Sequence, residues 1–160
     1  MTQHILGVDA AWTVNGSSGL CLMHYKSGQK PEVIHLGRSY DEFLKGEIRW
    51  EEKAKASAPR LDEIIRQIGV TPDAVALDIP LSPEPITGYR EADRQITRRY
   101  SRMGAAVHSP TKERPGKIAE TMFQQLTEAG IRWAGVEARP DRPYFMEVYP
   151  HVTIIEMLGL

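Results

Sequence analysis

Three strand-like segments joined by short connections open the chain and limit the folds that it can adopt. They cover residues 4–11, 19–26 and 32–38, and the turn-forming letters TVNGSSG separate the first two. Short connections favour antiparallel neighbours, so we expect a three-strand meander. A predicted helix over 58–68 and a short apolar strand over 73–80 follow. A helix between strands implies a crossover, which places the fourth strand parallel to the sheet.

The rest of the chain alternates loops and helices around one more strand. We expect helices over 89–104 and 117–130, a strand over 142–150 and a final helix that begins in HVTIIEMLGL. This order predicts an α/β domain in which helices flank a mixed sheet. An antiparallel meander, a crossover helix and a parallel strand are the layout of the ribonuclease H-like (RNase H-like) fold.

Composition removes several classes of protein. The 160 residues suit a single domain, and the formal net charge of −1 gives no general attraction to nucleic acid or anionic membrane. The one cysteine, Cys21, excludes an internal disulfide, and its apolar neighbours favour a buried small hydrophobe. The chain contains no signal-peptide pattern and no apolar run of membrane length. We therefore expect a cytoplasmic protein without a membrane partner.

Three carboxylates interrupt apolar strand patterns: Asp9 in GVDAA, Asp78 in VALDIP and Glu147 in YFMEVYP. A buried carboxylate needs a cation, hydrogen-bond donors or a proton, and a single one is readily explained as the partner of an arginine. Three that lie close together repel each other, and a divalent cation such as Mg²⁺ removes that repulsion. Two metal ions roughly 3.5–4 Å apart can activate a water for phosphodiester cleavage.

Arginines recur every four residues in the predicted helix that follows Asp78. They are Arg90, Arg94, Arg98 and Arg102, with Arg99 beside them. At helical spacing these side chains form a stripe, and guanidinium groups bind phosphate through two hydrogen bonds. The alternative is an ordinary solvated helix face, with Asp93 either a fourth metal ligand or the partner of a neighbouring arginine.

The loop VHSPT is the remaining polar motif. Ser109 and Thr111 are candidate phosphate contacts, together with His108. The simpler interpretation is a turn before Pro115 in which Ser and Thr side chains accept backbone N–H groups.

The chain resembles the domain of unknown function 429 family, whose members are predicted RNase H-like nucleases. The motifs that carry this resemblance are GVDAAW, VALDIPLS, YREADRQITRRY, VHSPT and MEVYP. The resemblance runs from residue 5 to near residue 155. It implies an RNase H-like fold and acidic site positions at Asp9, Asp78, Asp93 and Glu147. Family members continue beyond a motif like EVYPHVTI, so we expect one RNase H-like domain over 1–160 that is shortened at its C-terminus.

We therefore predict a nuclease that uses Mg²⁺ or Mn²⁺ to hydrolyse nucleic acid. Asp9, Asp78 and Glu147 are the predicted metal ligands and catalytic residues, with Asp93 as a fourth acid. The predicted substrate contacts are Arg90, Arg94, Arg98, Ser109 and Thr111.

Two alternatives remain open at this stage. One is a non-catalytic module that binds nucleic acid or protein on the same fold. The other is an ATP-binding phosphotransferase like actin or the sugar kinases, for which VNGSSG is the one candidate phosphate turn. The apolar end IIEMLGL also leaves a homo-oligomer open.

Overall fold

A six-stranded mixed sheet forms the centre of the molecule, in the spatial order β3-β2-β1-β4-β6-β5. The structure is a computed structural model and describes residues 2–137 and 140–160. The strands are β1 (Thr2–Asp9), β2 (Gly19–Lys26), β3 (Glu32–Gly37), β4 (Ala74–Asp78), β5 (Arg132–Trp133) and β6 (Tyr144–Glu147).

Strand directions confirm the predicted fold class. The strands β1, β2 and β3 form an antiparallel meander, and β4 pairs in parallel with β1 on one side and with β6 on the other. This is the RNase H-like arrangement that the order of elements predicts. The two-residue strand β5, parallel to β6, is an addition that the sequence pattern does not indicate.

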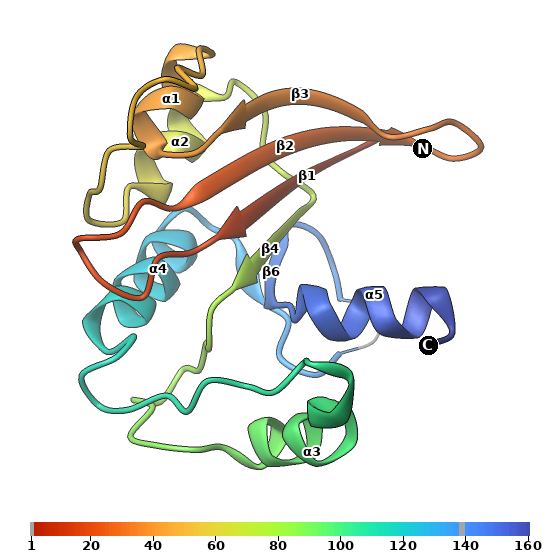
Figure 1. The fold of residues 1–160 in the computed structure, drawn as a ribbon. Helices are drawn as coiled ribbons and strands as arrows, with labels where there is room; N and C mark the ends of the chain where they lie inside the picture. The colour runs from red at the N-terminus through yellow and green to blue at the C-terminus, as the bar shows by residue number, and fades with distance from the viewer. Residues whose placement is uncertain (1, 138–139) are drawn as a thin grey trace.

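Helices flank the sheet (Figure 1). They are α1 (Tyr40–Lys45), α2 (Leu61–Gln67), α3 (Glu91–Tyr100), α4 (Lys117–Glu128) and α5 (Pro150–Leu158). A single 3₁₀ turn, η1 (Ser101–Met103), follows α3. Within residues 2–137 and 140–160, no helix is long and apolar enough to cross a membrane.

One face of the sheet is buried by helices α1, α2 and α4. Leu6 and Val8 of β1, Leu77 of β4 and Phe145 of β6 point into this core and are almost fully inaccessible to solvent. Burying one such side chain contributes roughly 1.5–3 kcal/mol. The helices supply apolar faces because Leu61 and its neighbours repeat at helical spacing.

The opposite face of the sheet is built from smaller side chains. Gly7 of β1 lies in register with Cys21 of β2 and with Ala76 of β4, and Cys21 lies in register with Leu36 of β3. In-register neighbours on adjacent strands present their side chains on the same face. Cys21 therefore lies on this second, partly open face rather than in the main core.

A smaller apolar cluster joins α3 to α5. Tyr100 and Ile155 are buried there together with Ala105, and the Tyr100 hydroxyl donates to Glu156. In Figure 1 these two helices lie together below the sheet. This packing places α3 beyond the strand ends where β4 and β6 finish.

Candidate active site

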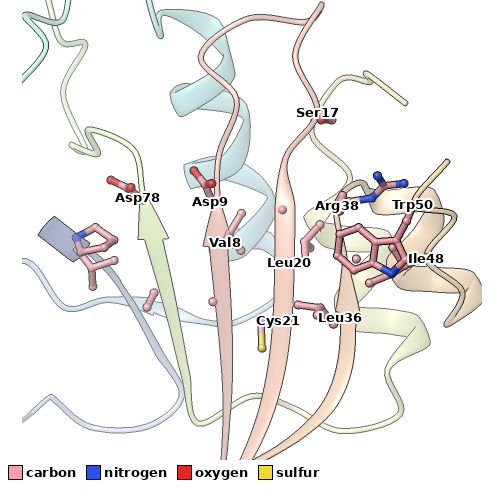
Figure 2. A pocket seen from close by; sticks show the side chains of 16 residues that line it. Val8, Asp9, Ser17, Leu20, Cys21, Leu36, Arg38, Ile48, Trp50 and Asp78 are labelled. Atoms are coloured by element: carbon pink, nitrogen blue, oxygen red, sulfur yellow. The ribbon is translucent and has the colours of Figure 1, made fainter. Parts of the chain in front are cut away.

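Asp9 and Asp78 lie side by side at the carboxyl ends of two parallel strands. Each is the last residue of its strand, and the two are partners in the β1–β4 ladder. Adjacent strands are about 4.8 Å apart, so in-register side chains on one face are neighbours. Figure 2 shows the two carboxylates at neighbouring strand ends.

The environment of Asp9 differs from that expected from its apolar surroundings. The sequence suggests a strand that continues to residue 11 and buries this carboxylate, but β1 ends at Asp9 and the side chain is exposed. Val8 and Ala10 are buried on the other side of the backbone. Water therefore solvates Asp9, and no buried partner is needed for it.

Burial raises the pKa of Asp78 above its usual range, and the charge of Asp9 raises it further. His151, at the start of α5, acts in the opposite direction, while Glu147 adds a smaller repulsion. Among the described residues, no lysine or arginine forms an ion pair with Asp9 or Asp78. In the described part of the chain, the acid pair thus carries negative charge without a lysine or arginine partner.

The acid pair suits a hard divalent cation. Mg²⁺ prefers oxygen ligands and is often held by one or two carboxylates while it keeps several waters. A closed cage is not formed, because no three His, Cys, Asp or Glu side chains of residues 2–137 and 140–160 lie together in a metal-binding arrangement. Two carboxylates with open positions fit a hydrated Mg²⁺ or Mn²⁺ ion.

Glu147 is not brought to the acid pair. In the β4–β6 ladder it is the partner of Leu77, so its side chain lies on the opposite face from that of Asp78. Its carboxylate accepts hydrogen bonds of 2.6 and 2.7 Å from Arg90 and one of 2.9 Å from the backbone N–H of Leu81.

Asp93 shares the same arginine. It is 2% exposed and accepts from the backbone and the guanidinium of Arg90, at distances of 2.8 to 3.0 Å. These contacts cap the N-terminus of α3. Asp93 and Glu147 thus already have a cationic partner, the Arg90 guanidinium.

Arg90 uses all five of its guanidinium N–H groups inside the protein. Two go to Asp93, two to Glu147 and one to the carbonyl oxygen of Leu81. Burial alone lowers the pKa of Arg90, but the hydrogen bonds to the two carboxylates outweigh it and raise that pKa. In this arrangement Arg90 has no donor left for a phosphate.

The other arginines of α3 differ in how they are paired. Arg94 donates to Glu91 and to the Tyr89 carbonyl, and Arg99 pairs with Glu156 at 3.0 Å. Arg98 is exposed and has no ion-pair partner in the described part of the chain. Arg98 is therefore the predicted substrate contact with the freest guanidinium.

Loop VHSPT lies beside the end of β1. The rings of His108 and Trp12 are in edge contact at 6.3 Å, and both line a hollow of about 320 Å³ with Ser109 and Arg114. Thr111 accepts from the backbone N–H groups of the next turn. Ser109 thus faces a hollow, whereas the Thr111 hydroxyl is used within the turn.

A larger hollow of about 620 Å³ lies on the open sheet face next to the acid pair. Its walls include Asp9, Asp78, Cys21, Arg38 and Trp50 (Figure 2). Arg38, Trp50 and His151 are not among the site residues that the sequence predicts. A tryptophan within the charged segment IRWEE was the available signal for Trp50.

Comparison with protein families adds one finding. The family model described as "Protein of unknown function (DUF429)" matches residues 7–160, so the chain belongs to this family. No curated protein and no solved structure matches the chain.

Proposed function

We propose that this member of the DUF429 family is a metal-dependent nuclease whose metal ligands are Asp9 and Asp78. The observation that carries the proposal is the in-register pair of carboxylates at the ends of β1 and β4, with which no lysine or arginine of the described residues forms an ion pair. Repulsion within such a pair is relieved when a cation binds between the two carboxylates.

In the proposed reaction, Asp9 and Asp78 act only as metal ligands. A bound Mg²⁺ or Mn²⁺ ion supplies a Lewis acid and an activated water for phosphodiester hydrolysis. Asp9 and Asp78 hold it at an edge of the sheet that is open to solvent. Arg98, on the exposed face of α3, adds positive charge for the nucleic-acid backbone.

A non-catalytic nucleic-acid-binding module is the second candidate, and a specific observation favours it. Arg90 occupies both Glu147 and Asp93, which leaves only two of the four predicted acids available. A single hydrated ion with two carboxylate ligands supports binding without the second ion of a two-metal mechanism.

Cleavage of labelled DNA and RNA, single- and double-stranded, tests the proposal. We expect cleavage that requires Mn²⁺ or Mg²⁺, stops with a chelator and falls at least about 100-fold in Asp9→Asn and in Asp78→Asn. Asp62→Asn, an acid on α2, is the matched control and retains activity. Metal-dependent binding without cleavage supports the binding module, and cleavage by Asp78→Asn at the wild-type rate rules out the proposed site.

A further inference from the structure

The hollow beside the acid pair has a flat, apolar floor. Gly7, Cys21 and Ala76 come from three neighbouring strands and lie in one row across the sheet. Their small side chains leave space above the strands that larger residues would fill. The hollow is thus a trough over β2, β1 and β4 that is open to solvent and has a mainly apolar lining.

An aromatic ring forms the rim on the side away from the aspartates. Trp50 is 70% exposed, and the Arg38 guanidinium lies 5.1 Å from the centre of its ring. In Figure 2 these two side chains lie beside each other next to β3. Trp50 stays largely exposed although Arg38 lies over one face of its ring, so another flat ring has room to stack on the indole.

The loop that carries Trp50 is held to the sheet. Arg38 donates to the Glu42 carboxylate through two nitrogens and also to the carbonyl oxygen of Arg49. The Arg38 hydrogen bonds lower the pKa of Glu42, so this carboxylate is ionised at neutral pH. Trp50 is therefore presented by a tethered loop, and its exposure is not that of a loose segment.

The trough combines three chemical features at defined places. It has a flat apolar floor, a stacking surface at one end and a negative pair at the other. The rim above β3 is two strand spacings, or roughly 10 Å, from Asp9 on β1 and three spacings, or roughly 14 Å, from Asp78 on β4. One nucleotide spans a comparable length from the outer edge of its base to its phosphate.

We infer that the trough seats an unpaired nucleobase, which makes single-stranded nucleic acid the substrate class of the site. The inference rests on the proposed function, because a phosphate approaches Asp9 and Asp78 only with a cation between them. A base in a duplex is stacked on both sides and paired at its edge, so only an unstacked base enters such a trough. Stacking on Trp50 tolerates any base.

Two variants, each with a control, test whether the trough itself binds the base. Trp50→Ala removes the exposed stacking surface without disturbing the core. Ala76→Met fills the trough, and Ala74→Met is its matched control, because Ala74 lies two residues earlier on the same face of β4 but does not line the trough. Trp50→Phe restores a stacking ring.

Fluorescence anisotropy with a labelled phosphorothioate decamer, single-stranded or annealed to its complement, measures the effect in Mn²⁺. We expect the single strand to bind at least about ten-fold more tightly than the duplex. Trp50→Ala and Ala76→Met are expected to weaken binding about 5- to 100-fold, while Trp50→Phe and Ala74→Met stay within about three-fold of wild type.

Several results would overturn the inference. One is binding by Trp50→Ala and Ala76→Met equal to that of the wild type, and another is equal affinity for single strand and duplex. A third is a wild-type dimer in sedimentation that Ala76→Met converts to monomer, because a second copy then occupies the trough. Failure of the proposed nuclease is distinct: it leaves Trp50-dependent binding intact while no cleavage responds to Asp9→Asn.

Discussion

Two pairs of carboxylates lie near the ends of β4 and β6, and their surroundings are opposite. Asp9 and Asp78 adjoin each other on one sheet face without a basic partner among the described residues. Asp93 and Glu147 are joined by Arg90, which forms an ion pair with each of them. An acidic residue within a strand pattern is therefore free to bind a metal ion only where no arginine forms an ion pair with it.

Removing Arg90 is expected to have the largest effect on stability. Arg90→Met leaves the buried Asp93 and the half-buried Glu147 without their guanidinium donors, at a cost of about 2–4 kcal/mol. Urea denaturation measures it, with Arg94→Met as the matched control, expected within about 0.5 kcal/mol of wild type. Equal stability of the two variants would show that the hydrogen bonds from Arg90 to Asp93 and Glu147 do not stabilise the fold.

Asparagine substitutions in the two pairs are expected to have opposite signs. Asp93→Asn weakens the contact with Arg90 and destabilises the protein by about 1–3 kcal/mol. Asp78→Asn removes repulsion from Asp9 and stabilises the metal-free protein by up to about 1 kcal/mol. Thermal unfolding in chelator measures both, and a destabilised Asp78→Asn would contradict an unneutralised pair.

The difference in stability between Asp78→Asn and the wild type is expected to depend on pH. The folded-state pKa of Asp78 is raised, so the folded protein binds this proton more tightly than the unfolded chain does. The cost of ionising Asp78 is fully present above its folded-state pKa and disappears as the pH falls below the unfolded value of about 3.9. The stability advantage of Asp78→Asn should therefore shrink on acidification, as measured by urea denaturation at several pH values. A constant advantage would exclude ionisation as its cause.

The smallest expected effect concerns the arginines of α3. Arg98→Gln should weaken nucleic-acid binding a few-fold and reduce the slope of log affinity against log salt by about 0.7–0.9. Arg99→Gln, whose arginine is already paired with Glu156, should change the slope less. A salt titration of both variants compares them directly. Equal slopes would show that pairing does not determine which arginine meets the phosphates.

Much of the fold follows from local signals in the sequence. Turn-rich TVNGSSG and the alternation around Leu6 and Val8 mark the meander, and the spacing of Leu61 and Ile64 marks α2. The juxtaposition of Asp9 and Asp78 follows from the strand order, because parallel strands end at the same edge. These features depend on patterns a few residues long.

Other features of the site depend on long-range contacts that local sequence patterns do not indicate. Whether Glu147 shares a face with Asp78 is decided by one residue of register between β4 and β6. The pairing of Arg90 with Glu147 joins positions 57 residues apart. Trp50 stands in a charged stretch, and only the fold places it over the sheet beside Arg38.

Calorimetric titration with Mn²⁺ measures directly whether Asp9 and Asp78 form a metal site. It compares the wild type with Asp9→Asn and Asp78→Asn from one pair and Glu147→Gln from the other. We expect Mn²⁺ binding in the wild type, its loss in both aspartate variants, and its persistence in a folded Glu147→Gln protein. Absence of binding in the wild type, or undiminished binding by Asp78→Asn, would contradict the assignment of the metal to Asp9 and Asp78.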